Sequence, residues 1–168
     1  MGKKNYARTT IGPFCIGGGE IKNSVLMGYS NKSDDGDIGD SVLGEWCNLG
    51  AGTSNSNLKN TAGIVKVWSN EENCFIDAGA KCGLLMGDYS RCAINTSFNT
   101  GTVAGVSCNI FGNSFPPKYI EDFAWGDDTY IFEKAINDIN NWKKLKGFEI
   151  TPAEIESLKK FYELKKQK

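Results

Sequence analysis

The sequence predicts an all-β solenoid built from hexapeptide repeats, with one inserted β-hairpin and a helical C-terminal extension. Three apolar residues carry the prediction, because Ile38, Leu43 and Leu49 are each followed at once by glycine. Apolar residues in a strand recur every two positions, and those in a helix every three or four. An interval of five to six instead fits a three-sided coil, in which each side places one aliphatic side chain on the axis.

The same rhythm extends on both sides of this segment. Aliphatic residues followed by glycine begin at Ile11, and the pattern resumes at Met86 and continues to Ile110. We therefore expect about five coils over residues 7–114. The chain contains 20 glycines, which suits a fold that turns every few residues. Two prolines, Pro116 and Pro117, are expected to end the solenoid because proline cannot donate to a strand ladder.

Residues 58–83 break the rhythm. Apolar runs at 64–68 and 74–76 flank a polar turn, a pattern typical of a β-hairpin that leaves the coil. Insertions of this kind often border a binding site.

Residues 115–168 are expected to form a helical cap or tail. Ile131, Ala135, Ile139 and Trp142 line one face of a helix over residues 129–145, which we expect to cap the solenoid end. A second helix is indicated by Thr151-Pro-Ala-Glu154, a capping box with proline at the first helical position. Its many lysines fit a solvated face, or a site for an anionic partner.

Composition narrows the class of protein. Net charge is −1, so the sequence predicts no binding to nucleic acid or membranes. The N-terminal residues lack the apolar segment of a secretory leader, which favours a cytoplasmic location.

The chain has no histidine, and its six cysteines form no C-x-x-C pair, so no metal site is expected. Cys47, Cys92 and Cys108 fall in the repeats and are expected to be buried structural thiols, and Cys74 and Cys82 are the one pair to consider for a metal or disulfide role.

Several motifs together carry a family resemblance over about residues 7–126. They are Ile11-Gly-Pro-Phe14, Met27-Gly-Tyr-Ser-Asn-Lys32, Ile38-Gly-Asp40, Gly44-Glu-Trp-Cys-Asn-Leu-Gly50 and Phe98-Asn-Thr-Gly-Thr102. The chain resembles the C-terminal domain of bacterial sugar-1-phosphate nucleotidyltransferase/acetyltransferase enzymes of the N-acetylglucosamine-1-phosphate uridyltransferase type. The resemblance implies a single-stranded left-handed parallel β-helix that assembles as a homotrimer. The nucleotidyltransferase half of such enzymes is not found in this sequence, which predicts either a stand-alone domain or part of a longer protein.

The resemblance also implies a reaction and a set of site residues. Family members transfer acetyl from acetyl-CoA to the amine of a sugar phosphate, in a cleft between subunits. Lys22 and Asn48 match residues that contact the sugar phosphate, and Ala51 and Asn57 match residues beside acetyl-CoA. The family's catalytic histidine aligns with Asp34. Further departures are Asp37 in place of an aromatic residue, Leu58 in place of tyrosine, and Tyr89 where close relatives have histidine.

The replacement at Asp34 leaves two functions open. An aspartate with an ordinary pKa of about 3.9 is a weaker base than a histidine at about 6.5, although crowding among the aspartates of this turn would raise the pKa of one carboxylate. The first hypothesis is a sugar-phosphate acyltransferase-like domain with Asp34 as the base. The alternative is a non-catalytic trimerisation module that assembles a nucleotidyltransferase. The acidic turn itself also fits a solvated loop or a divalent cation site.

Two other groups of side chains admit both structural and binding roles. Trp46, Trp68 and Trp125 could stack on a sugar or nucleotide, or pack in the core or between subunits. The asparagines of the repeats, including Asn48 and Asn57, could form an amide ladder along the coil.

Overall fold

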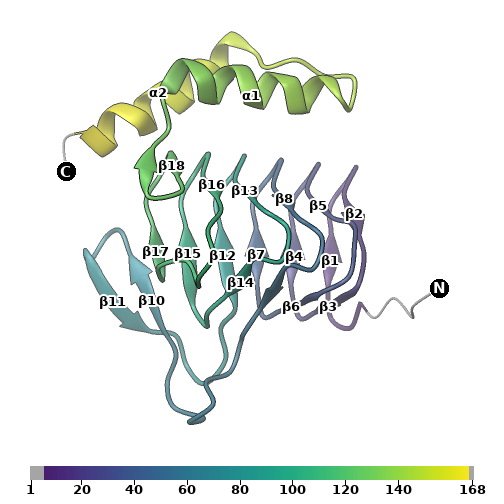
Figure 1. Cartoon of the computed structure of the whole chain (residues 1–168), viewed down its shortest axis with the longest axis vertical. Coiled ribbons are helices and arrows are strands. Elements are labelled where there is room, and N and C mark those ends of the chain that lie inside the picture. Colours follow the sequence, from purple (N-terminus) through teal and green to yellow (C-terminus); the bar gives the residue numbers. More distant parts are fainter. Residues whose placement is uncertain (1–5, 167–168) are drawn as a thin grey trace.

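The computed structural model describes residues 6–166 and shows a three-sided parallel solenoid with two helices along one side (Figure 1). The first five residues, on which the expectation about a leader depends, and the last two residues of the predicted helical segment lie outside the described residues. Two helices follow the solenoid, α1 (Phe132–Lys144) and α2 (Pro152–Lys166).

Two sides of the solenoid are parallel sheets. The first sheet consists of β1 (Thr10–Ile11), β4 (Val25–Leu26), β7 (Val42–Leu43), β12 (Leu84–Met86), β15 (Thr102–Ala104) and β17 (Tyr119–Ile120). The second sheet consists of β2 (Ile16–Gly17), β5 (Asn31–Lys32), β8 (Asn48–Leu49), β13 (Arg91–Cys92), β16 (Asn109–Ile110) and β18 (Ala124–Trp125), with β19 (Asp128–Thr129) antiparallel at its edge.

The third face is less continuous. It consists of β3 (Glu20–Lys22), β6 (Asp37–Gly39), β9 (Ser54–Asn55) and β14 (Ser97–Phe98), and only the pairs β3–β6 and β9–β14 form regular ladders. Between β6 and β9 the side chain of Asn55 replaces the ladder. Its amide nitrogen donates to the carbonyl of Gly39, and its oxygen accepts from the Gly39 peptide N–H, both at 3.0 Å. The buried amide therefore links the two pairs.

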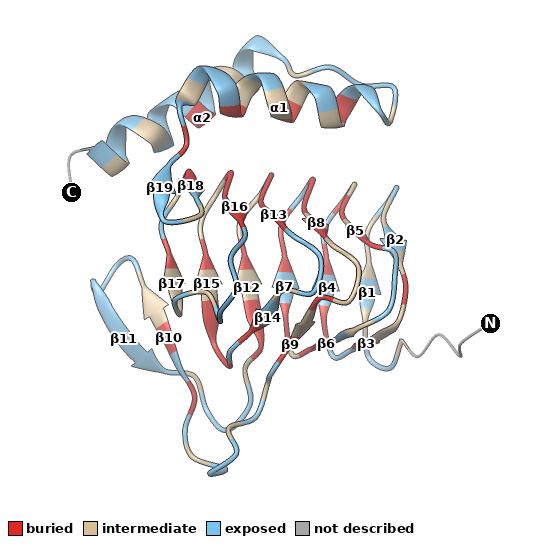
Figure 2. Cartoon of the chain, in the orientation of Figure 1, coloured by how far each residue is buried: buried red, intermediate tan, exposed pale blue. Residues whose placement is uncertain are grey.

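The core consists of inward-facing residues stacked from coil to coil (Figure 2). Ile38, Leu43 and Leu49 are all buried, as their spacing predicts. Each side contributes one column, with Ile21, Ile38 and Phe98 on the third face, Leu26, Leu43 and Met86 on the first sheet, and Leu49, Cys92 and Ile110 on the second. Cys47, Cys92 and Cys108 are buried free thiols. The architecture is the left-handed parallel β-helix that the sequence predicts.

The inserted hairpin is confirmed. Strands β10 (Lys66–Ser69) and β11 (Cys74–Asp77) pair antiparallel, with Lys66 opposite Asp77. The hairpin packs against the end of the first sheet through Trp68, whose ring stacks on Tyr119 with centroids 4.6 Å apart. Strand β11 itself is exposed (Figure 2).

Two expectations about the C-terminal part are wrong. Pro116 and Pro117 do not end the solenoid, because β17 pairs with β15 and β18 with β16 beyond them. The prolines fall in the loop that replaces a strand of the third face, where no ladder donor is needed. Each sheet therefore has six parallel strands, one more than the expected number of coils.

Helix α1 does not cap the solenoid end, and instead runs along its side (Figure 1). Tyr130, just before the helix, packs on Trp125 of the last coil, whereas Phe148, just after it, contacts Phe14 of the first coil. The surface beneath is the aromatic corner, which we define as the turn residues Phe14, Tyr29, Trp46, Tyr89 and Phe123 between the first and second sheets. All five have a left-handed backbone, with φ between 55° and 64°. Such a conformation costs about 1–2 kcal/mol per residue. Stacking of Phe14, Tyr29 and Trp46 on one another, and burial of Trp46, Tyr89 and Phe123 in one apolar cluster with the helices, offset this cost.

Candidate functional site

Lys22 and Asn57 lie on the same edge of the solenoid, which we call the asparagine corner. It consists of Asn23, Asp40 and Asn57, at equivalent positions of successive coils between the third face and the first sheet. The Asp40 carboxylate accepts hydrogen bonds from the amides of both neighbours, with Asn57 Nδ2 at 2.5 Å. The Asn57 amide is therefore already engaged within the chain.

Lys22 lies beside this corner, at the end of β3, and is exposed. Its ammonium forms an ion pair with the carboxylate of Glu20, and this hydrogen bond raises the pKa of Lys22. The lysine stays charged at neutral pH and is held at the surface of the third face, where it can meet an anionic group.

Asp34 and Ala51 lie on a different edge, the glycine corner, where Gly19, Gly36 and Gly52 turn the chain from the second sheet to the third face. Gly36 has a φ of +104°, and a Cβ atom placed there would lie 2.1 Å from the carbonyl oxygen of Thr53. Successive coils are therefore in tight contact at this corner, which brings the turn of Asp34 next to the turn of Ala51. The Asp34 side chain is exposed and accepts a hydrogen bond of 2.9 Å from Ser33 Oγ.

A buried lysine supports the acidic turn from inside. Lys32 takes an inward position on β5, in register with Gly17 on one side and beside Leu49 on the other, and is 0% exposed. Its ammonium donates to the carbonyl oxygen of Asp34 at 2.6 Å and also to that of Asp35. Desolvation lowers the pKa of Lys32. Lys32 is not among the residues predicted from the sequence, although its place beside the inward Leu49 marks it as an inward position.

The third face joins the two corners. Glu20 and Asp37 are in register on β3 and β6, so their carboxylates lie on adjacent coils. Partial burial, together with the charge of Glu20, raises the pKa of Asp37. A carboxylate with a raised pKa is a better proton acceptor near neutral pH than an ordinary aspartate. The third face therefore presents a cation, the Lys22 ammonium, and a carboxyl group with a raised pKa, that of Asp37.

Asn48 lies apart from the other four predicted residues, on the second sheet. It accepts a hydrogen bond of 3.5 Å from Asn31 Nδ2, and its neighbour in register on the next coil is Arg91. The Arg91 guanidinium is buried 5.1 Å from the centre of the Trp142 ring in α1. Asn48 therefore belongs to an asparagine-rich row on the face that α1 follows, consistent with the amide ladder considered above.

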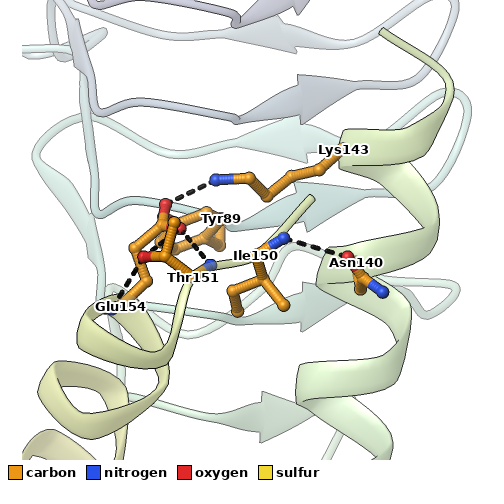
Figure 3. A network of polar contacts seen from close by, with 6 residues as sticks. All are labelled: Tyr89, Asn140, Lys143, Ile150, Thr151 and Glu154. Atoms are coloured by element: carbon orange, nitrogen blue, oxygen red, sulfur yellow. Dashed lines mark hydrogen bonds and ion pairs between the residues drawn. The ribbon is translucent and has the colours of Figure 1, made fainter. Parts of the chain in front are cut away.

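Tyr89 connects the solenoid to the C-terminal helices (Figure 3). Its hydroxyl donates to Glu154 Oε1 at 2.8 Å, and Lys143 Nζ donates to the same oxygen at 2.5 Å. Burial and the Glu154 carboxylate raise the pKa of Tyr89, so the phenol remains a proton donor. At the position where the resemblance implies histidine, this chain thus has a residue that anchors α2.

Four grooves of the chain are lined by residues other than the five predicted site residues. Among residues 6–166, no group of three or more Cys, Asp or Glu side chains is arranged to hold a metal ion. Neither described helix is long and apolar enough to cross a membrane.

Comparisons with known proteins point to one group of relatives. The chain is 32% identical over 117 residues to the bifunctional protein GlmU of Methanocaldococcus jannaschii and 31% identical over 115 residues to that of Methanococcus aeolicus. It is 36% identical over 93 residues to a bifunctional sugar-1-phosphate nucleotidylyltransferase/acetyltransferase of Sulfurisphaera tokodaii. These matches cover 68%, 68% and 55% of the chain, but only 28%, 26% and 23% of the relatives. No protein-family model matches the sequence.

The chain thus spans less than a third of the length of the curated relatives it matches. Its repeats, its three-sided coil and these identities agree on a single relationship. The protein is a left-handed parallel β-helix related to the bifunctional sugar-1-phosphate nucleotidyltransferase/acetyltransferases of the GlmU type.

Proposed function

We propose that the chain is a sugar-phosphate acyltransferase-like domain that binds an amino-sugar phosphate and acetyl-CoA. The observation that carries the proposal is the polar third face, where Lys22 and a pair of carboxylates remain outside the surface covered by α1 and α2. Three relatives of the chain are named as GlmU or acetyltransferase proteins, and this face carries four of the five predicted residues along its two edges.

Each of these residues has a proposed part. Lys22 exchanges Glu20 for the substrate phosphate, an exchange that an exposed ion pair allows at little cost. Asp34 takes the amine proton in place of histidine, and Asp37, whose pKa is raised, is a second proton acceptor on the same face. Ala51 and Asn57 border the acyl-CoA. Asn48 is not included, because it lies on the face that α1 follows. The buried free thiols of the chain, Cys47, Cys92 and Cys108, fit a reducing compartment. We therefore expect the protein to act in the cytoplasm.

Calorimetric titration tests the binding part of the proposal. We expect heat with acetyl-CoA and with an amino-sugar phosphate, and loss of the sugar-phosphate signal in Lys22→Ala. Lys66→Ala is the matched control, since Lys66 is an exposed ion-paired lysine on the hairpin. Absence of heat with every ligand removes the proposal. Turnover by the unmodified protein that disappears in Asp34→Asn would identify Asp34 as the base.

The first sheet favours a second function, assembly. Four of its outward residues form an apolar column, namely Val25, Val42, Leu85 and Val103. Val25 and Val42 are 37% and 38% exposed in the single chain. The third face is polar and the second sheet is partly covered by α1, so this column is the surface best suited to bury against copies of itself. We propose a homotrimer formed through this sheet.

The two functions are compatible, and one variant separates them. Gain of acetyltransferase activity in Asp34→His, absent from the unmodified protein, would identify a trimerisation module whose catalytic site has decayed. Activity in the unmodified protein would identify a working enzyme.

A further inference from the structure

The largest of the four grooves lies away from the third face, at the end of the solenoid. It has a volume of about 680 Å³ and lies between the inserted hairpin, the last strand of the first sheet and helix α2. Figure 1 shows the hairpin and the end of α2 on the same side of the last coils. Three segments distant in the sequence thus form one concave surface, and no residue of the proposed acyltransferase site lines it.

One wall of the groove is an aromatic surface with a fixed orientation. Trp68 stacks on Tyr119 with ring planes 20° apart, and Phe75 contacts Trp68 edge-on at 5.2 Å. The amide oxygen of Asn70 accepts hydrogen bonds from Trp68 Nε1 and from the Tyr119 hydroxyl, each at 3.1 Å. Because both rings use the oxygen, the amide NH₂ group remains as a donor held in a defined direction.

The opposite wall comes from α2 and is also apolar. Phe161 and Leu164 are 47% and 57% exposed, which is unusual for large apolar side chains that share a concave surface. Between the walls, Glu121 Oε2 lies 3.9 Å from Lys165 Nζ. Asp122 adds a second carboxylate to the lining, so acidic groups outnumber the single lysine.

We propose that this groove binds a neutral pyranose sugar. A pyranose ring has an apolar C–H face that stacks on aromatic rings, and hydroxyl groups around its edge that pair with amides and carboxylates. The aromatic wall, the oriented amide of Asn70 and the Glu121–Lys165 pair supply both kinds of contact. The excess of carboxylates disfavours phosphorylated ligands, which distinguishes this groove from the site of the proposed acyltransfer.

The four tryptophans of the chain provide the test. In ¹⁵N-labelled protein each indole N–H gives its own signal, and the probes are cellobiose, N,N′-diacetylchitobiose and, as an anionic comparison, glucose 1-phosphate. We expect a saturable shift of the Trp68 signal with at least one of the neutral disaccharides at millimolar concentration, with Trp46 and Trp142 unchanged and glucose 1-phosphate weaker. No shift of Trp68 with either disaccharide overturns the proposal. The proposal is also overturned if the Trp68 signal shifts with protein concentration in the absence of sugar, because a second copy of the chain would then occupy the groove.

Two variants with matched controls locate the binding. Phe161→Ala is expected to weaken the sugar affinity about fivefold, whereas Phe115→Ala, an exposed phenylalanine of another groove, leaves it unchanged. Asn70→Asp keeps the acceptor for both rings but removes the amide donor, and should abolish the shift. Asn113→Asp makes the same exchange in that other groove and should not. Equal effects of each variant and its control would contradict the assignment.

Discussion

Lys143 Nζ lies 2.5 Å from Glu154 Oε1, and this ion pair joins the last turn of α1 to the first turn of α2 at the surface of the solenoid (Figure 3). The Lys143 ammonium also lies 4.8 Å from the centre of the Trp46 ring. Glu154 in turn accepts from Tyr89 and, through its other oxygen, from the Thr151 peptide N–H at 2.7 Å. A single carboxylate thus caps α2, pairs with α1 and holds both helices on the aromatic corner.

Lys143→Met is expected to destabilise the protein by about 3 kcal/mol, because it leaves the Glu154 carboxylate partly buried without its cation. Lys143 is only 5% exposed and the Glu154 side chain 28%, so solvent compensates only in part for the lost cation. Urea unfolding, followed by tryptophan fluorescence, measures the change. Lys144→Met is the control, since the neighbouring side chain is half-exposed and should stay within about 0.5 kcal/mol of the parent. Equal losses in the two variants would show that the ion pair does not hold the helices.

The same carboxylate predicts an acid-sensitive contact. Partial burial alone would raise the pKa of Glu154, but hydrogen bonds from Lys143, Thr151 and Tyr89 outweigh it and hold the pKa at about 2. A carboxyl whose folded-state pKa is depressed stabilises the fold above its unfolded pKa, and this contribution fades as pH falls toward the folded value. The advantage of the parent over Glu154→Gln should therefore be complete at pH 6 and shrink between about pH 4.5 and 2. Melting temperatures across that range measure it, and a constant difference would contradict the assignment.

Much of the solenoid follows from sequence because its period is short and its interior tolerates few residue types. Ile38, Leu43 and Leu49 were enough to define the three sides. Where two apolar residues are adjacent, the sequence predicts less clearly which of them points into the core. Met27 precedes a glycine as the repeat requires, yet Leu26 points inward and Met27 is 46% exposed. The extra coil after Pro117 does not show the repeat pattern, because neither of its inward residues, Ile120 and Ala124, is followed directly by glycine.

The candidate site was less predictable because its residues are related through space. Asp34 and Ala51 meet at the glycine corner, and Lys22 and Asn57 share the asparagine corner. Asn48 is separated from them because it lies on the second sheet, and α1 packs along that face. An apolar helical face shows that a helix will pack, but not on which side of a solenoid. The same limit applies to the groove of Trp68 and Phe161, whose walls come from an insertion and a C-terminal helix.

Gly36→Ala is expected to cost at least 3 kcal/mol, or to prevent folding. The new methyl group would overlap the backbone carbonyl of Thr53, and residue 36 has a left-handed φ that disfavours side chains. Gly79→Ala separates the two causes, because Gly79 has a φ of +83° but nothing within 4 Å of the added carbon. The free energy of unfolding of Gly79→Ala should therefore fall by only about 1 kcal/mol. Chemical denaturation of both variants measures the difference, and similar costs would mean that the coils are not in tight contact at the glycine corner.

Lys32→Met should loosen the acidic turn more than the fold. Methionine suits a column that contains Leu49 and Cys92, so the core is retained and the free energy of unfolding should change by less than about 1.5 kcal/mol. The carbonyl oxygens of Asp34 and Asp35 lose their donor, however. Amide hydrogen exchange in residues 34–37 is expected to accelerate at least tenfold, with residues 49–55 unchanged. Uniform acceleration along the chain would instead indicate a general loss of stability.

Val42→Lys tests whether the first sheet forms the homotrimer. Val42 lies in the middle of the apolar column, with Val25 on one neighbouring strand and Leu85 on the other. In a single chain the lysine would extend into solvent from a residue already 38% exposed, so the monomer should remain folded. In the proposed trimer it would be buried among apolar side chains of the other copies, an arrangement that costs several kcal/mol for an unpaired charge. Sedimentation velocity should therefore show a trimer for the parent and a monomer for Val42→Lys, with unchanged far-ultraviolet circular dichroism. Ile94→Lys places the same charge on the second-sheet side of the glycine corner and should remain trimeric, whereas dissociation of both variants would exclude the first sheet as the specific contact.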